Sequence, residues 1–171
     1  MVDRRQALVA TAAVPLALGG CAMSAVQTFP TVGAALAALQ ALPATARTKS
    51  GWDLARVLQH AAQSIEFSMQ GFPELKSALF RGSVGKLAFA VFDARGRMSH
   101  ALDEPIPGAP ALADGQPLPD AVRRLAKALN EFDAWRAPLA PHFAYGLLDK
   151  PAYTRAHLMH LADHWTELAA A

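Results

Sequence analysis

Three histidines near the C-terminus, His157, His160 and His164, have the spacing of residues on one face of a helix. At about 100° per residue, the three side chains fall within about 60° of one another. Neutral imidazole is a common metal ligand, and histidines four residues apart can bind one ion from successive helical turns. The same face is apolar, so these histidines could instead be buried groups that hydrogen-bond to the backbone or pair with carboxylates. The spacing leaves both interpretations open.

A further histidine, His60, lies in a second segment with helical periodicity, beside Ser64 and Phe67 at the edge of the apolar stripe. If the two segments pack together, His60 can face the same space as the C-terminal histidines. Metal sites in helical bundles are built from side chains on facing helices. A histidine on a second helix therefore favours the metal interpretation.

Other polar residues have weaker signals. His142 and Tyr145 lie in a short loop flanked by proline and glycine, where they could line the mouth of the site or simply pack. His100 is predicted to be a surface histidine. Glu66 and Asp163 could orient a ligand histidine through its second ring nitrogen. Each points away from the histidine face of its own helix, so a solvated position is predicted for both.

The elements that must position these residues are helical. Apolar residues recur at steps of three and four over residues 31–42, 52–70, 118–136 and 149–167. Asp149 has the position of an N-cap before the last of these segments. The run 87–92 could be a strand. We predict a helix over 75–98 instead, because the remainder is helical and an isolated hairpin is marginally stable.

Residues 98–119 contain five prolines and two glycines and are expected to form a long crossover loop. Long ordered loops in compact domains are often functional. The fold class that follows is all-α, an antiparallel four-helix bundle with a short leading helix.

The N-terminus has the parts of a bacterial export signal. Arg4 and Arg5 precede an apolar stretch, residues 7–17, and small residues then lead to Cys21. The arginine pair resembles the twin-arginine export signal. Leu-Gly-Gly-Cys, residues 18–21, resembles the lipobox of bacterial lipoproteins, whose cysteine is acylated.

An uncleaved membrane anchor is the alternative, because residues 7–26 carry no charge and about 20 apolar residues can span a bilayer. Glycines and a proline inside this stretch favour the lipoprotein. We therefore predict a signal peptide over 1–20, a lipidated tether over 21–30 and a helical domain over 31–171. The domain would face the periplasm from a membrane of the cell envelope.

Composition and charge argue against a nucleic-acid-binding protein and a disulfide-stabilised domain. The chain has 171 residues, enough for one domain with a core, and a formal net charge of +2. This balance provides no electrostatic footprint for nucleic acid. Cys21 is the only cysteine, so no disulfide can form within the chain.

Three motifs occur in order along the helical domain. Trp-Asp-Leu at 52–54 precedes His60, Pro-His-Phe-Ala-Tyr-Gly occupies 141–146, and Tyr153 precedes a His-x-x-x-His pair. Together they resemble the DinB/YfiT-like superfamily, in particular a branch without assigned function, over residues 31–168. The resemblance implies a four-helix bundle.

The metal triad of that superfamily is one histidine on the second helix and a His-x-x-x-His pair on the last. The resemblance thus implies that His60, His160 and His164 are the metal ligands. His157 would then support the ligands or face the substrate. Three histidines without a carboxylate or thiolate leave at least one coordination position open, as catalytic metals require. Zinc is expected first, with nickel or iron as alternatives.

The superfamily includes metal-dependent thiol transferases and related isomerases. We therefore expect an envelope metalloenzyme, a hydrolase or transferase of undetermined substrate, with His157, His142 and Tyr145 as candidate catalytic residues. A non-catalytic metal- or ligand-binding lipoprotein is the competing interpretation. The expected partners are the membrane through the lipid, a small-molecule ligand and a second copy of the chain, but not nucleic acid.

Overall fold

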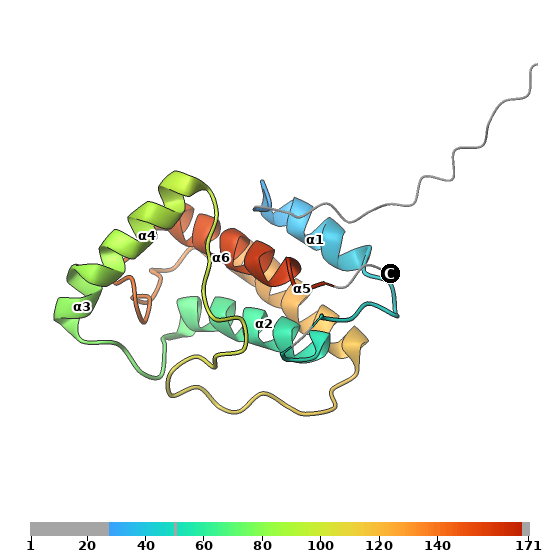
Figure 1. The fold of residues 1–171 in the computed structure, drawn as a ribbon. Helices are drawn as coiled ribbons and strands as arrows, with labels where there is room; N and C mark the ends of the chain where they lie inside the picture. The colour runs from blue at the N-terminus through green and yellow to red at the C-terminus, as the bar shows by residue number, and fades with distance from the viewer. Residues whose placement is uncertain (1–27, 50, 169–171) are drawn as a thin grey trace, which may run out of the picture.

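The computed structural model describes residues 28–49 and 51–168 (Figure 1). These residues form the helices α1 (Val32–Gln40), α2 (Leu54–Gln70), α3 (Ala78–Gly82), α4 (Val84–Arg95), α5 (Leu118–Ala134) and α6 (Lys150–Trp165). Within the described ranges there are two isolated bridges and no β-strand, which confirms the all-α prediction. The predicted signal peptide and Cys21 lie outside the described residues.

No helix in the described part of the chain is long and apolar enough to cross a membrane.

Local sequence signals determine where the helices begin. Thr31, Asp53 and Asp149 cap α1, α2 and α6, and each side chain accepts a hydrogen bond of 2.8–3.0 Å from the backbone N–H three residues later. A proline in the first turn begins α5. The ends predicted for the four segments with helical periodicity therefore agree with the structure to within two residues, whereas the single helix predicted over 75–98 is divided into α3 and α4.

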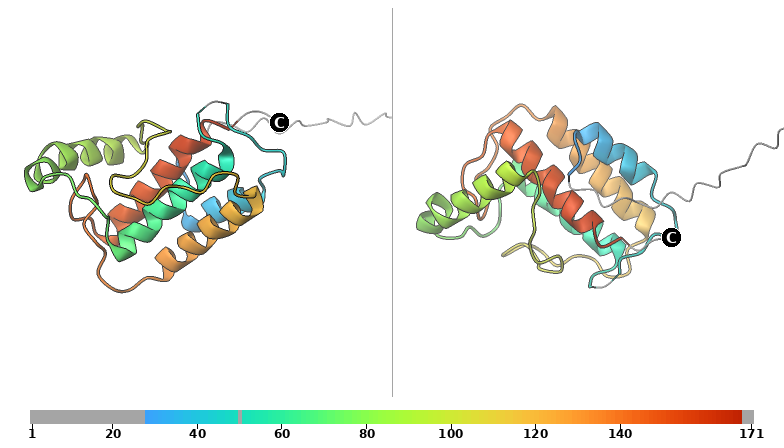
Figure 2. Two further views of the ribbon diagram at one scale, coloured as in Figure 1. Left: turned by 90° about the horizontal axis from the view of Figure 1, so that it is seen from below. Right: turned by 45° about the horizontal axis from the view of Figure 1, so that its top comes forward.

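The main core lies between α1, α2, α5 and α6, which run side by side (Figures 1 and 2). Leu58 of α2, Leu125 and Phe132 of α5 and Leu161 of α6 are each at most 1% exposed. Burial of one such side chain contributes about 1.5–3 kcal/mol. This core fixes the position of α2 relative to α6, on which the histidines lie.

Residues 75–98 are mostly helical, as predicted, but α3 and α4 stand apart from the main core (Figure 1). Phe89 of α4 instead packs with Met98, Ala156 and Met159 in a small second core on the side of α6. The main core therefore takes its fourth helix from the short leading helix α1, not from the 75–98 segment.

The crossover loop (residues 98–117) is held against the bundle by polar side chains of α2. Gln59 is 1% exposed and exchanges two hydrogen bonds of 3.0 Å with the backbone of Ala113. One turn later, Gln63 donates to the carbonyl oxygen of Pro110 at 3.1 Å. The loop thus follows a defined path past α2 and α6 (Figure 2).

Gly85 is a point of close approach between α4 and the loop that carries His142 and Tyr145. A Cβ atom at this position would overlap the carbonyl oxygen of Ala144. We therefore expect Gly85→Ala to destabilise the protein by about 1–3 kcal/mol, as overpacking does. Gly82→Ala is the matched control, because a Cβ built there has no described atom within 4 Å apart from its chain neighbours and the backbone of its own helix. Thermal melts compare the two variants, and an unchanged melting temperature for Gly85→Ala would contradict this packing.

Candidate metal centre

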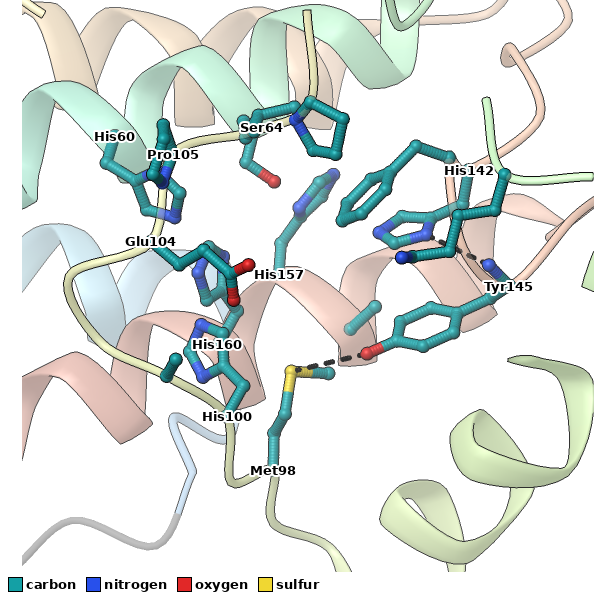
Figure 3. Close-up of a pocket in the computed structure, with 16 residues that line it drawn as sticks. His60, Ser64, Met98, His100, Glu104, Pro105, His142, Tyr145, His157 and His160 are labelled. Atoms are coloured by element: carbon teal, nitrogen blue, oxygen red, sulfur yellow. Dashed lines mark hydrogen bonds between the residues drawn. The ribbon is translucent and has the colours of Figure 1, made fainter. Parts of the chain in front are cut away.

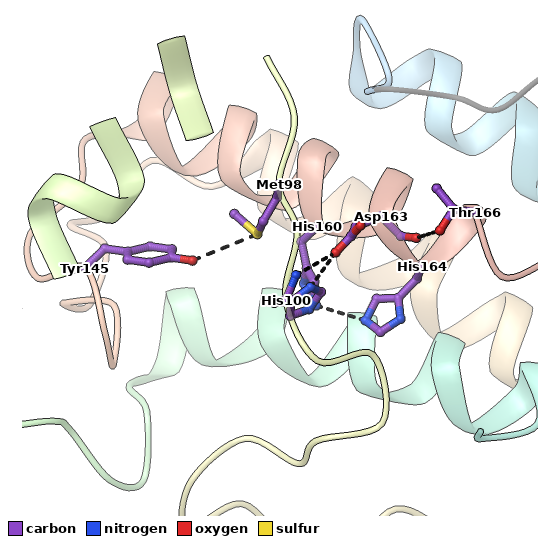
Figure 4. Close-up of polar contacts among 7 residues, drawn as sticks. All are labelled: Met98, His100, Tyr145, His160, Asp163, His164 and Thr166. Carbon is purple, nitrogen blue, oxygen red and sulfur yellow. Dashed lines mark hydrogen bonds and ion pairs between the residues drawn. The ribbon is translucent and has the colours of Figure 1, made fainter. Parts of the chain in front are cut away.

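Four histidine side chains converge where the crossover loop passes α6 (Figures 3 and 4). His60 comes from α2, His160 and His164 come from α6, and His100 comes from the loop. One ring nitrogen of each lies within 4.8 Å of those of the others. The Nε2 atoms of His160 and His164 are 3.0 Å apart. Two nitrogens on one zinc ion would be roughly 3.3 Å apart, so the cluster has the dimensions of a metal site.

Two helices, α2 and α6, carry three of the four histidines of the cluster. His160 and His164 are one turn apart on α6, so their side chains are neighbours. The packing of α2 places the ring centroid of His60 at 5.1 Å from that of His160 and 5.3 Å from that of His164. The Trp52 indole also packs edge-on against the His60 ring, at 5.4 Å. The three ligands expected from the sequence therefore lie together.

The protonation state of the cluster suits metal binding. Burial, followed by the neighbouring histidines, lowers the pKa of His60 to about 4 and that of His164 to about 2. The same causes lower the pKa of His160 well below its usual value. These rings are therefore neutral at pH 7, the state in which imidazole binds metal.

Two ring nitrogens without hydrogen-bond partners also favour a metal site. Within the described residues, the buried Nδ1 atoms of His60 and His164 have no hydrogen-bond partner. A buried polar atom without a partner costs free energy, and a bound ion that reorients or uses these rings would offset that cost. The all-nitrogen donor set and its protonation state therefore fit a divalent transition metal.

The structure gives His100 a role that the sequence does not predict. His100 is exposed, as predicted, yet it belongs to the cluster, with its ring centroid 4.6 Å from that of His160. The Asp163 carboxylate accepts hydrogen bonds from the Nδ1 of His100 at 2.6 Å and from its backbone N–H at 3.1 Å (Figure 4). A carboxylate on one ring nitrogen leaves the other as the metal-binding atom.

Asp163 is therefore not merely solvated, because it orients one histidine of the cluster. Glu66, the other carboxylate considered, forms an ion pair with Arg124 at 2.7 Å instead.

His157 is buried beside the cluster but has a partner of its own. Its Nε2 lies 3.1 Å from the Oγ of Ser68. Ser68 donates its only hydroxyl proton to the carbonyl oxygen of Ile65 at 2.6 Å. The Ser68 oxygen must then accept from Nε2–H of His157, which leaves the Nδ1 of His157 as an acceptor.

A cavity of about 140 Å³ adjoins the cluster (Figure 3). His60, His100 and His160 line one end, and His142 and Tyr145 lie at the other. His157 lines the cavity between these ends. The three candidate catalytic residues named from the sequence therefore all contact one cavity, although none of them belongs to the histidine cluster.

Sequence reasoning did not single out Glu104 of the crossover loop. Its carboxylate points into the cavity from the wall (Figure 3). Only the path of the loop brings it there, so no local pattern in the sequence could have identified it.

Fold and site together define a helical protein with a four-histidine cluster beside a small cavity. The chain belongs to the family described as "Protein of unknown function (DUF1569)", which it matches over residues 24–171. No curated protein and no solved structure matches the chain.

Buried histidines should make the stability of the metal-free protein depend on pH. Burial, chiefly, lowers the pKa of His142 and that of His157 to about 3, whereas both titrate near 6.5 in the unfolded chain. Between these values the unfolded chain binds more protons. The free energy of unfolding should therefore fall as the pH drops from about 6.5, by up to about 1.4 kcal/mol per pH unit for each group.

Urea denaturation from pH 7.5 to 4.5 in the presence of a chelator measures this dependence. His157→Gln keeps an amide donor for Ser68 but has no titrating ring, so its profile should be shallower. Equal profiles for the variant and the wild-type protein would show that His157 is not held neutral by the fold.

Proposed function

We propose that the histidine cluster holds a divalent metal ion and that the protein is a metal-dependent hydrolase or transferase. The observation that carries this proposal is the convergence of four imidazole rings from three separate parts of the fold. Zinc suits neutral nitrogen ligands at this spacing best, and nickel and iron also accept imidazole. When bound, the ion would activate a water molecule or polarise a substrate oxygen.

The four histidines differ in how firmly they are held. His60, His160 and His164 lie on packed helices and would form the permanent ligand set. His100 lies on the exposed crossover loop and is the group best placed to leave a coordination position to substrate. In the adjoining cavity, the Glu104 carboxylate and the Nδ1 of His157 can each accept a proton from a nucleophile.

A second candidate function follows from the same four residues. Structural zinc sites are closed by four protein ligands, whereas catalytic sites keep one position open. If His100 stays bound, the ion only stabilises the fold, and the protein is a non-catalytic metal- or ligand-binding lipoprotein. The cavity beside His60, His100 and His160 favours the enzyme, because a closed structural site needs no adjoining space for substrate.

Two sequence features extend the proposal. The DinB/YfiT-like motifs support His60, His160 and His164 as ligands, and a common core of α1, α2, α5 and α6 is compatible with a four-helix bundle of that type. The twin-arginine and lipobox-like segments support export and a lipid anchor at Cys21. The protein would then act at the periplasmic face of the envelope on a small molecule, alone or as a homodimer.

Metal content tests the proposed site. We expect the wild-type protein to bind one equivalent of zinc and to melt at a lower temperature after chelation, because a ligand that binds only the folded state stabilises it by mass action. His60→Ala and His160→Ala should lose the ion and this stabilisation. His157→Gln is the control and should keep both. Elemental analysis and thermal melts give the readouts. A wild-type protein that takes up neither zinc, nickel nor iron would overturn the proposal.

His100→Ala separates the two candidate functions in the same assay. With three permanent ligands and an exchangeable fourth, the variant should retain the ion with reduced affinity. Loss of the ion as complete as in His60→Ala would favour the closed, non-catalytic site.

The anchoring proposal has its own test. Cys21 is the only candidate acyl acceptor, so Cys21→Ser should release the protein into the soluble fraction or leave an unprocessed precursor. Membrane fractionation and the mass of the product measure this. Normal cleavage together with full membrane retention in the variant would exclude the lipid anchor.

A further inference from the structure

The end of the cavity opposite the histidine cluster carries a hydrogen-bond donor whose proton position is fixed. His142 is 7% exposed, and its Nδ1 accepts hydrogen bonds from the backbone N–H groups of Ala144 at 3.1 Å and Tyr145 at 3.2 Å. A ring nitrogen that accepts carries no proton, so the neutral ring is protonated at Nε2. His142 therefore lines the cavity as an N–H donor.

Tyr145 provides a second donor at the same end. Its ring stacks on that of His142, with 4.2 Å between centroids and 5° between planes. Its hydroxyl points along the cavity and donates to the Sδ of Met98 at 3.9 Å (Figure 3). A thioether sulfur is a weak acceptor, so an oxygen atom would compete successfully for this proton. Burial raises the pKa of Tyr145 to about 12, which keeps the hydroxyl protonated at neutral pH.

We propose that His142 Nε2–H and Tyr145 O–H together bind the carbonyl oxygen of a small carboxylic acid or amide. The rest of that ligand would lie along the apolar wall formed by Met98, Ile106 and Ala156 and would extend toward the histidine cluster. The inference rests on the proposed function in one respect, namely that this cavity is the substrate site. The binding itself does not, because neither donor belongs to the cluster.

The surroundings of the two donors favour this class of ligand. Lys76 lines the same cavity and is exposed, so it can attract a carboxylate without the cost of a buried charge. Phe143 and the prolines of the crossover loop supply further apolar surface. A ligand without an acceptor oxygen would leave the buried donor of His142 unsatisfied, which is unfavourable.

Titrations of the full chain with three probes test the proposal. Butyrate and butyramide share an apolar chain and a carbonyl oxygen, whereas n-butylamine has the chain without an acceptor. Ligand-observed NMR would be recorded on protein treated with chelator and on protein loaded with zinc. Nitrogen-15 spectra of the imidazole groups would report which nitrogen of His142 carries the proton.

We expect butyrate or butyramide to bind, and the tighter of the two identifies acid or amide. n-Butylamine should bind at least about 10-fold more weakly, since it leaves two donors unpaired. Tyr145→Phe should weaken the better probe about 3- to 10-fold, which corresponds to one hydrogen bond. Tyr153→Phe is the matched control and should leave binding unchanged, because its hydroxyl donates to the carbonyl oxygen of Ala140 at 2.7 Å.

Equal binding of the three probes, unaltered affinity in Tyr145→Phe, or a proton on the Nδ1 of His142 would overturn the inference. Its failure is distinguishable from failure of the metal proposal. If the protein binds the probe but takes up no metal, the donor site is supported and the metal site is contradicted. If the protein takes up metal but binds no probe, the metal site is supported and the donor site is contradicted.

Discussion

The packing of α2 against α6 buries histidine rings beside an apolar core. The rest of the site depends on how the nitrogens of these rings are satisfied. A buried neutral imidazole loses its hydration, which is unfavourable unless its nitrogens find new partners. His157 and His142 find them in a serine hydroxyl and in backbone N–H groups. Within the described residues, the Nδ1 atoms of His60 and His164 do not. The leucines that hold the two helices together therefore also hold an electron-rich cluster at close range.

This difference divides the buried histidines into two groups with different chemistry. Those with protein partners have defined proton positions and present one donor, His142, and one acceptor, His157, to the same cavity. His160 and His164 contact each other instead, with their Nε2 atoms 3.0 Å apart, and burial, followed by repulsion from protonated neighbouring histidines, lowers their pKa values. These rings are therefore neutral at pH 7, and a neutral ring can offer a nitrogen lone pair to a metal ion.

The crossover loop joins the two groups into one site. Gln59 and Gln63 bind its backbone from α2, and Asp163 binds His100 from α6. The loop thereby places His100 at the cluster and Glu104 at the cavity wall. A loop held by a few hydrogen bonds can open at lower free energy than a packed helix. The exposed member of the cluster, His100, is thus also the one that lies on a loop and not on a packed helix.

The sequence by itself determined the helices and the pairing of His160 with His164, because periodicity, N-caps and i,i+4 spacing are local properties of the chain. It also indicated His60, through its place at the edge of the apolar stripe of a second helix. The tertiary structure alone decided the role of His100, which lies 63 residues from Asp163 in sequence. It also decided the tautomers of the cavity histidines. The reason is physical: the path of a proline-rich loop and the partner of a ring nitrogen depend on contacts between distant segments, which no local pattern encodes.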